Sequence, residues 1–451
     1  MDVPTTSVVP QTRGNELIAR LDRLPRMSRA HWAWLPLLGL LSVGDTVDNY
    51  VLADAAPAMK GNWGLSLAQV GNLASLSMLG MFVGAVIGGR LSDRFGRKRI
   101  ILSGTLLYAV SSILCGLAPN FAVLGLFRTL SGVGIQAVLG ALIVYVAEMF
   151  PARVRGRSQA AVLGVGLLGV PLAAFAAKLI IPLDPHAWRW VFVVGALGLI
   201  PAVVGRSVMP ESVRWLIAAG RDEEAARIVS RLESRYSGEL PPPVLVEAAA
   251  PPAKGKVAEL FTGYQRRITI ITMLTLVFGI VAFYGFNSWV PTLLVERGYS
   301  TDVALTITTM LSIAPPIGAL AAMVVTDRWQ RRRVLASVSL VAAALMVVFA
   351  LTNVFWLTVV AGFSIALLLQ ANAVTIYAYL PEVFPTKLRG LGSGLSNGAG
   401  RLAGVGGAAL VAAVYGLAGF QGVFLTTAAF YLLTAVVIGL FGENTRDRSL
   451  R

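Results

Sequence analysis

Twelve apolar runs, each about as long as a lipid bilayer is thick, constrain the fold of this chain more than any other feature. A membrane-spanning helix needs roughly 20 apolar residues, because it rises ~1.5 Å per residue through a hydrocarbon core ~30 Å thick. Runs of this kind occur at 32–56, 66–88, 99–118, 122–148, 158–181, 188–208, 267–290, 303–326, 333–352, 355–380, 391–415 and 420–441. Charged residues make up 14% of the chain, against about 25% in soluble proteins. The sequence therefore predicts an all-α membrane protein with twelve transmembrane helices.

Basic residues in the connections between the runs predict the orientation in the membrane. All but six of the 38 Lys and Arg residues lie in segments that share one side of the membrane if the N-terminus is inside. Such an excess is typical of cytoplasmic loops. We therefore expect a multi-pass protein of a bacterial inner membrane, with both termini in the cytoplasm. The net charge of +15 then reflects topology, and we expect the lipid bilayer as a partner and no nucleic acid.

The composition argues against several other classes of protein. One cysteine and two histidines can form neither an internal disulfide nor an ordinary zinc site. Residues 1–31 lack the short apolar core of a signal peptide. No nucleophile and base are arranged as in an enzyme, so we expect no catalytic residues, no metal site and no cofactor.

A long polar segment separates six runs from the six that follow. The sequence predicts a cytoplasmic N-terminal segment, a six-helix bundle, a cytoplasmic linker loop, a second six-helix bundle and a cytoplasmic tail, bounded at 1–31, 32–208, 209–266, 267–441 and 442–451. Within the loop, "RDEEAARIVSRLES" at Arg221–Ser234 predicts a short surface helix. The proline-rich stretch Pro241–Lys254 predicts a stiff linker.

Two motifs recur in the two halves at a constant separation of 234 residues. "EMFPARVRG" at Glu148–Gly156 and "EVFPTKLRG" at Glu382–Gly390 are identical at five of nine positions. "SDRFGRKR" at Ser92–Arg99 and "TDRWQRRR" at Thr326–Arg333 have the same separation. Two motifs in one register indicate a duplicated six-helix unit and two bundles related by pseudo-two-fold symmetry.

These motifs resemble those of the major facilitator superfamily over essentially the whole chain. "GRLSDRFGRK" at Gly89–Lys98 is similar to the superfamily's loop motif between helices 2 and 3. The second copy departs from it, with Met323 and Gln330 in place of two glycines. "PESVRWL" at Pro210–Leu216 resembles the sugar-porter branch. The resemblance implies the major facilitator fold and transport by alternating access.

Within that branch, the chain is most similar to the aromatic acid:proton symporters. The similarity lies in the pair Asp45 and Asp48, in "NSWVPTLLVERGYS" at Asn287–Ser300, and in Arg401. Thr46 stands where that family carries a glycine, which is a departure from its pattern. The resemblance implies proton-coupled uptake of an aromatic carboxylate.

The charged residues of the repeated motifs are the predicted cytoplasmic gate. A carboxylate at a helix end can cap a neighbouring helix and pair with loop arginines. We hypothesise that these clusters lock the inner ends while the protein faces outward and separate when it opens inward. Ordinary charge at the membrane edge is the alternative. The gate residues are Asp93, Arg94, Arg97, Glu148 and Arg155 in the first half, and Asp327, Arg328, Glu382 and Arg389 in the second.

Charged residues within the runs that have no counterpart in the other half are the candidates for transport chemistry. Charges inside a bilayer are costly and usually face a cavity. Asp45 and Asp48 share a helix face, and Arg128 is predicted level with Asp45. Burial and mutual repulsion favour a protonated carboxyl, whereas a nearby guanidinium favours an ionised one. We therefore predict that these three residues couple transport to protons, with a static ion pair to Arg128 as the alternative.

Arg401 and several polar residues of helices 7 and 10 form the predicted substrate site. A guanidinium at mid-membrane can grip a carboxylate with two parallel hydrogen bonds, and a structural ion pair between the halves is the alternative. The other residues are Tyr284, Asn287, Gln370, Asn372 and Tyr377, for which membrane-interface anchoring or interhelical hydrogen bonding is the alternative. Asp54 is expected as a solvated carboxylate at the outer end of its helix.

The function predicted from these residues is proton-coupled uptake of a small organic anion by a monomeric transporter. Importing a monoanion against an inside-negative potential costs about 2.3 kcal/mol per 100 mV, and one accompanying proton cancels that cost. Uptake of a sugar, a nicotinate-like acid or an organic cation remains open. Efflux of drugs is disfavoured by "GVGLLGVPLAAF" at Gly164–Phe175, which lacks the paired glycines of exporters. A nutrient sensor built on the same fold is a further alternative.

Overall fold

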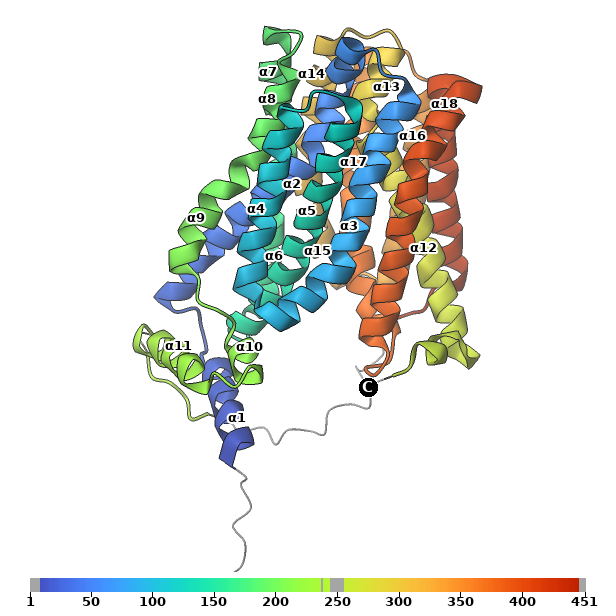
Figure 1. Cartoon of the computed structure of the whole chain (residues 1–451). Coiled ribbons are helices and arrows are strands. Elements are labelled where there is room, and N and C mark those ends of the chain that lie inside the picture. The colour runs from blue at the N-terminus through green and yellow to red at the C-terminus, as the bar shows by residue number, and fades with distance from the viewer. Residues whose placement is uncertain (1–8, 237, 244–254, 446–451) are drawn as a thin grey trace, which may run out of the picture.

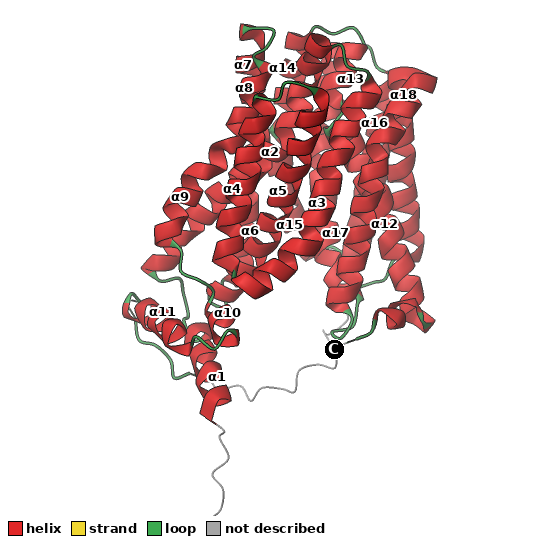
Figure 2. Ribbon diagram, in the orientation of Figure 1, coloured by secondary structure: helices red, strands yellow, loops and turns green. Residues whose placement is uncertain are grey.

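The computed structural model describes residues 9–236, 238–243 and 255–445, and almost all of these lie in helices (Figure 2). The first half contains α1 (Val9–Asp22), α2 (Arg29–Trp63), α3 (Leu67–Phe95), α4 (Arg97–Gly116), α5 (Phe121–Met149), α6 (Arg155–Gly166), α7 (Gly169–Ile180), α8 (Trp188–Val194), α9 (Leu199–Val208), α10 (Val213–Ala218) and α11 (Asp222–Ser234). The second half contains α12 (Gly263–Asn287), α13 (Val290–Glu296), α14 (Thr301–Ser312), α15 (Ala314–Arg328), α16 (Arg331–Leu351), α17 (Phe355–Val383) and α18 (Arg389–Phe441). Short 3₁₀ turns lie at Ile181–Leu183, Gly195–Gly198 and Val257–Phe261.

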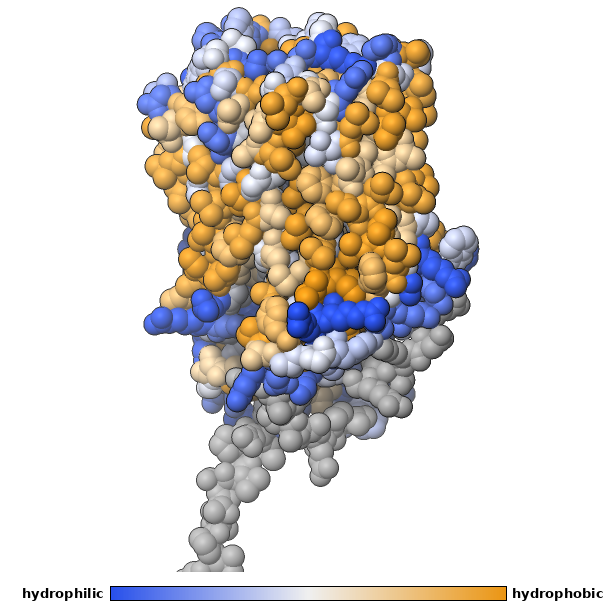
Figure 3. Space-filling model, turned by 90° about the vertical axis from the view of Figure 1, so that its right-hand side faces the viewer, coloured by the Kyte–Doolittle hydropathy of each residue, from blue (hydrophilic) through white to orange (hydrophobic). Residues whose placement is uncertain are grey.

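These helices make twelve membrane crossings within the described residues. Ten stretches are long and apolar enough to cross a membrane, and α6 with α7, α8 with α9, and α14 with α15 each form one of them. The 53 residues of α18 supply two crossings, because the chain turns at Gly419, whose φ of 61° favours glycine. The remaining crossing is α2, which is more polar because it carries three aspartates. On the face shown in Figure 3, a hydrophobic belt lies between two hydrophilic ends. The predicted all-α membrane fold is therefore confirmed.

The duplication seen in the sequence reappears as a repeated close contact between helices. A Cβ atom added to Gly84 of α3 would clash with the carbonyl oxygen of Val133 in α5. A Cβ atom added to Gly318 of α15 would clash in the same way with the carbonyl oxygen of Leu367 in α17. Each residue of the second contact follows its counterpart by the 234 residues that separate the motifs. The two bundles thus pack their equivalent helices backbone to backbone through the same glycine.

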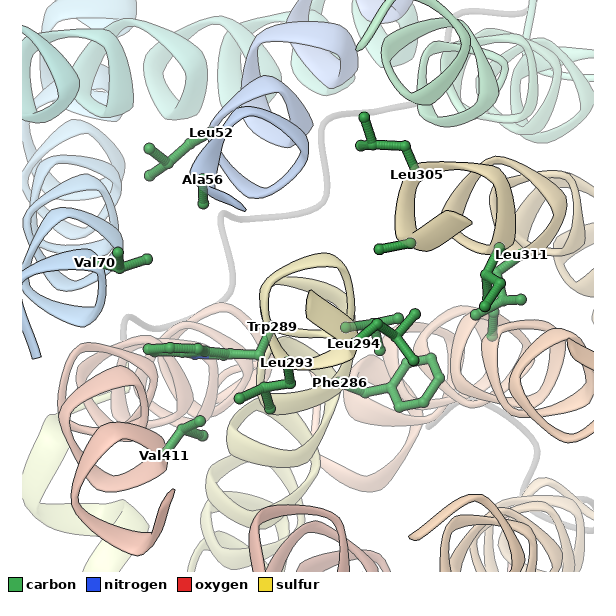
Figure 4. Packing of buried hydrophobic residues seen from close by; sticks show 14 of the residues in the cluster. Leu52, Ala56, Val70, Phe286, Trp289, Leu293, Leu294, Leu305, Leu311 and Val411 are labelled. Carbon is green, nitrogen blue, oxygen red and sulfur yellow. The ribbon is translucent and has the colours of Figure 1, made fainter. Parts of the chain in front are cut away.

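The largest hydrophobic core that the two halves share lies at one end of the molecule. We call the end that carries α1, α10 and α11 the basic end, and the opposite one the far end (Figure 1). The largest buried cluster joins the halves, with Leu52 and Val70 of the first and Trp289 and Leu293 of the second (Figure 4). Two further clusters, toward the basic end, each belong to one half. The halves therefore meet at the far end and diverge toward the basic end.

The polar linker contributes a small helical layer at the basic end. The predicted surface helix forms as α11, which packs against α1. Arg20 and Arg23 of α1 both contact Glu233 of α11, at 2.6 and 2.7 Å. Burial raises the pKa of Glu233, but hydrogen bonds from the two arginines outweigh burial and hold that pKa below its usual value. Most of the predicted stiff linker, residues 244–254, lies outside the described residues.

We expect Gly84→Leu to destabilise the protein, because α3 and α5 leave no room for a side chain there. Overpacking of this kind costs about 1–3 kcal/mol. Thermal unfolding in detergent should begin several degrees lower than in the unaltered protein. Gly140→Leu on α5 is the matched control, because a Cβ atom there meets nothing within 4 Å. Equal unfolding temperatures for the two variants would contradict the close contact.

Candidate functional site

A buried ion pair between α2 and α5 lies at the centre of the first half. Asp48 and Arg128 are 0% and 1% exposed, and Nη1 of Arg128 lies 3.5 Å from Oδ1 of Asp48. The guanidinium also donates to the backbone carbonyl of Asp48, at 3.3 Å, and to the hydroxyl of Ser77. The hydroxyl of Ser131 donates to Oδ2 of Asp48. The sequence placed Arg128 level with Asp45, but the packing of the helices pairs it with the aspartate one turn further along.

Asp45 is buried but less engaged than Asp48. Its side chain is 6% exposed, and Oδ1 has no hydrogen-bond partner among the described residues. Its electrostatic interactions are with Asp48 and, across the interface, with Arg401 of α18. The hydroxyl of Tyr108, which is also buried without a partner in the described part of the chain, interacts with both aspartates. Asp45 is therefore the carboxyl of the pair that is exposed to the charge of the second half.

Arg401 reaches the interface without forming an ion pair to any described residue. Its Nη1 contacts the sulfur of Met81 in α3 at 3.9 Å, and its Nε is buried without a partner. Its electrostatic interactions are with Asp45 and with Tyr284 of α12. The alternative of a structural ion pair between the halves is thus not formed by the described residues. The guanidinium is available to an anion.

A small cavity between the halves lies beside these groups, with a volume of about 40 Å³. Tyr284 and Asn287 of α12 line it, opposite Asn49 of α2 and Arg128. Tyr284 forms a side-chain hydrogen bond with Asn49, which joins the two halves across the cavity. Tyr377 of α17 is 47% exposed and interacts with Tyr284. Three predicted substrate residues, Tyr284, Asn287 and Tyr377, are thus close to the predicted coupling residues.

The two remaining predicted substrate residues, both on α17, lie elsewhere. The side-chain amide of Asn372 donates to the hydroxyl of Ser339 in α16, at 2.6 Å. This is the interhelical hydrogen bond named as the alternative, and it forms because Asn372 faces the inside of its own bundle. Gln370 is partly buried and lines neither that cavity nor the one beside Asp54 described below.

At the basic end, the repeated motifs form the same ion pair in each half. Arg97 contacts Asp93 at 2.9 Å and Glu148 at 3.0 Å. Arg331 contacts Glu382 at 2.5 Å in the second half. Arg331 is absent from the predicted set, although it occupies the position of Arg97 in the repeat, so the signal was present in the sequence.

Other predicted gate residues have different partners from those expected. A carboxylate–arginine pair between Glu148 and Arg155 would fit the predicted gate, but Arg155 instead contacts Asp22 of α1 at 2.9 Å. Glu148 accepts a hydrogen bond from Ser212, at 2.5 Å, which ties it to the start of α10. The physical reason is that α1 and α10 pack beneath the bundle and offer closer partners than the next turn of chain.

The remaining gate residues form no ion pair within the described part of the chain. Arg94 lies over the ring of Phe95, 5.2 Å from its centre. Arg328 and Arg389 have no acidic partner among the described residues, and the side chain of Asp327 lies outside them. The proposed lock between the inner ends of the halves therefore stays a prediction.

At the far end, two ion pairs that the sequence did not reveal join the halves. Lys60 at the end of α2 contacts Glu296 of α13 at 2.7 Å. Lys178 of α7 contacts Asp302 of α14. They close the interface above the packed side chains of Ala56 and its neighbours (Figure 4). Sequence spacing cannot identify such partners, because the residues of each pair belong to different halves.

The prediction for Asp54 is wrong. Asp54 is 3% exposed and does not stand in solvent at the helix end. The reason is the length of α2, which continues to Trp63, about 14 Å beyond Asp54. Asp54 instead lines a second cavity of about 30 Å³ between the halves, with Thr308 and Ser312 on its opposite side.

Comparison of the chain with known proteins identifies the family to which it is similar. Residues 41–451 match the family described as "Sugar (and other) transporter". The chain is 34% identical to a putative metabolite transport protein of Bacillus subtilis (strain 168), over 96% of each chain. It is 30% identical to a niacin transporter of Acinetobacter baylyi, over 96% of this chain and 99% of that protein. It is 29% identical to a gallate transporter of Pseudomonas putida, over 88% of each.

Among solved structures, the chain is similar to the xylose transporter of E. coli in a partially occluded inward-open conformation. The TM-score is 0.74 at 16% identity, and the match covers 92% of this chain and 98% of the other. At this identity the likeness shows the fold alone. The family match covers far more than half of the chain, and the twelve crossings in two bundles agree with it. This chain belongs to the sugar (and other) transporter family of the major facilitator superfamily.

Proposed function

We propose that this protein imports a small aromatic carboxylate together with a proton. The observation that carries the proposal is the state of Arg401, a membrane-embedded guanidinium with no acidic partner among the described residues. Arg401 is half-buried, with its Nε fully buried, and a guanidinium within a membrane is costly unless it is paired. A carboxylate ligand satisfies it with two parallel hydrogen bonds and supplies the missing negative charge.

The surroundings of Arg401 favour an aromatic substituent on that carboxylate. Tyr284 interacts with the guanidinium, and its ring packs edge-on against Phe283 at 5.3 Å. Tyr377 adds a second phenol near Tyr284. Aromatic faces bind an aromatic ring by offset or edge-to-face contact, and phenol hydroxyls bind polar ring substituents. The related niacin and gallate transporters are named for acids of this class. A sugar has no charge with which to satisfy Arg401.

Asp45 is proposed to carry the coupling proton. Its unpartnered oxygen and its interaction with Arg401 place it within electrostatic reach of a bound substrate. A substrate carboxylate on Arg401 withdraws positive charge from Asp45 and adds a negative charge beside it, which favours the protonated carboxyl. Substrate and proton then bind together, and the pair crosses the membrane without net charge. Asp48 remains tied to Arg128 and holds the site in shape.

The proposed orientation places the basic end in the cytoplasm of an inner membrane and treats the protein as a monomer. With this orientation the structure faces inward, because the halves are joined at the far end and apart at the basic end. Lys60–Glu296 and Lys178–Asp302 are then the outer gate. Transport requires these contacts to break while the basic ends approach, as in the rocking of one bundle against the other.

The central test is uptake into proteoliposomes with an imposed inward proton gradient. We expect uptake of 4-hydroxybenzoate, gallate or nicotinate, and none of xylose or choline. Arg401→Gln should raise the KM by roughly 30- to 150-fold, since about 2–3 kcal/mol of charge-assisted hydrogen bonding is lost. Arg401→Lys keeps the positive charge but loses the two parallel hydrogen bonds of the guanidinium, so its KM should lie between those of the unaltered protein and Arg401→Gln. Asp45→Asn should permit substrate exchange without a proton gradient but abolish gradient-driven accumulation.

Matched variants make this test decisive. Arg157→Gln removes an exposed arginine of α6 and should leave uptake unchanged. Uptake of choline or xylose with no uptake of any aromatic acid would refute the proposal. Accumulation by Asp45→Asn equal to that of the unaltered protein would remove Asp45 from proton coupling.

The outer gate predicts a charge-swap experiment. Lys60→Glu places two acids together at the far end and should slow uptake about three- to tenfold, because partly exposed pairs contribute about 1 kcal/mol. The double variant Lys60→Glu with Glu296→Lys restores opposite charges and should recover most of the rate. Initial uptake rates at saturating substrate measure both effects. Failure of the double variant to recover would mean that the two side chains do not act as a pair.

A further inference from the structure

Asp54 lines a cavity between the halves that the proposed mechanism does not use. It lies six residues beyond Asp48 on α2, about 9 Å closer to the far end. Its Oδ2 is buried and has no hydrogen-bond partner among the described residues. The cavity beside it is lined across the interface by Asn287, Thr308 and Ser312. The carboxyl therefore contacts both halves at the level where they are packed together.

Apart from Asp54 itself, the described residues that line this cavity carry no charged side chain that could stabilise an ionised Asp54. On its own helix the titratable neighbour is Tyr50, which interacts with it. From the other packed elements come Val170 and Ala174 of α7, Phe286 and Asn287 of α12, Val290 of α13, Thr308, Leu311 and Ser312 of α14, Pro315 of α15 and Ala366 of α17. All of these are uncharged.

The charged residues nearer the far end of the same elements have other partners. Lys178 of α7 pairs with Asp302 of α14, and Glu296 of α13 pairs with Lys60. The hydroxyls of Thr308 and Ser312 donate to backbone carbonyls of their own helix. An ionised carboxylate without a counter-ion or donors is among the most costly groups to bury. Closure of the far end around Asp54 is therefore favourable only for the neutral acid.

We propose that Asp54 is a proton-controlled latch, which must take up a proton from the outside before the far end closes. This inference rests on the proposed orientation and on alternating access. When the far end is open, water reaches the cavity and Asp54 exchanges its proton with the outside. When the far end closes, the neutral carboxyl is sealed between the halves. The proton returns to the outside when the far end reopens, so Asp54 adds a pH requirement without adding to the protons transported.

Linkage gives the size of the expected effect. If the closed state holds only the protonated acid, each unit of external pH above the midpoint of Asp54 in the open state lowers the closing equilibrium constant about tenfold. Alkaline medium outside should therefore hold the transporter outward-open. Asp54→Asn, which is neutral at every pH, should close as readily at high external pH as at low.

A thiol reporter tests this without requiring transport. Cys115→Ser removes the natural cysteine. Ala56→Cys then places a thiol that is 1% exposed in the closed interface, and a membrane-impermeant thiol reagent is added outside intact cells. Gly61→Cys, at a position where a Cβ atom meets nothing within 4 Å, corrects for the pH dependence of the thiol itself. The corrected labelling rate should rise about tenfold or more from roughly pH 6 to pH 9 outside.

Three variants of this reporter decide the outcome. Asp54→Asn should give a low labelling rate that does not change with pH, and Asp54→Glu should keep the rise. Asp184→Asn, which removes a carboxylate that is 63% exposed, should behave as the parent. A rise that persists in Asp54→Asn, or the absence of a rise in the parent, overturns the inference. If uptake is coupled to protons but the corrected labelling rate does not change with external pH, the latch alone is refuted. If uptake fails but the labelling rate depends on pH through Asp54, the transport proposal alone is refuted.

Discussion

The ion pair between Asp48 and Arg128 is the interaction on which the rest of the site depends. Each partner alone would be expensive within a membrane. The ion pair offsets both charges inside the first bundle, with further hydrogen bonds from Arg128 to Ser77 and from Ser131 to Asp48. The approach is possible because Gly195 has no side chain, since a Cβ atom there would lie 2.6 Å from Oδ1 of Asp48. With Arg128 committed to this pair, Asp45 and Arg401 interact electrostatically across the interface. Neither forms an ion pair with a described residue, and Arg401 donates only to the sulfur of Met81.

This distribution divides the charges by role. The paired residues inside each bundle hold helices together, as Arg97 with Glu148 and Arg331 with Glu382 do at the basic end. The charged groups left at the interface have no compensating charge from their own bundle. A ligand or a proton must supply it. Among the described residues, Arg401 has no acidic partner, Oδ1 of Asp45 has no hydrogen-bond donor, and the cavity beside Asp54 is lined by uncharged side chains. A transporter built in this way keeps its bundles rigid and confines its instability to the surface between them.

Much of the architecture was predictable, because hydropathy and repetition act along the chain. Runs of apolar residues match most helices to within about four residues, although α2 and α3 continue to Trp63 and Phe95, beyond the runs that end at 56 and 88. The polarity of α2 marks it as the helix with three buried aspartates. The absence of repeated counterparts singled out Asp45, Asp48, Arg128 and Arg401, which the structure brings to one region. Wrong assignments arose where a neighbour from another part of the chain intervened, as with Arg155 and Asp22.

The sequence by itself determined the number of crossings, the duplication, and the burial of Asp45, Asp48 and Arg128 in the membrane, since each of these follows from residue type and spacing along one chain. The tertiary structure alone decided the partners: Asp48 rather than Asp45 for Arg128, Ser339 for Asn372, and Glu296 for Lys60. It also moved Asp54 from the water's edge into the interface. The physical reason is that partner choice depends on helix tilt, on length beyond the apolar run and on the docking of two bundles, none of which is encoded in local periodicity.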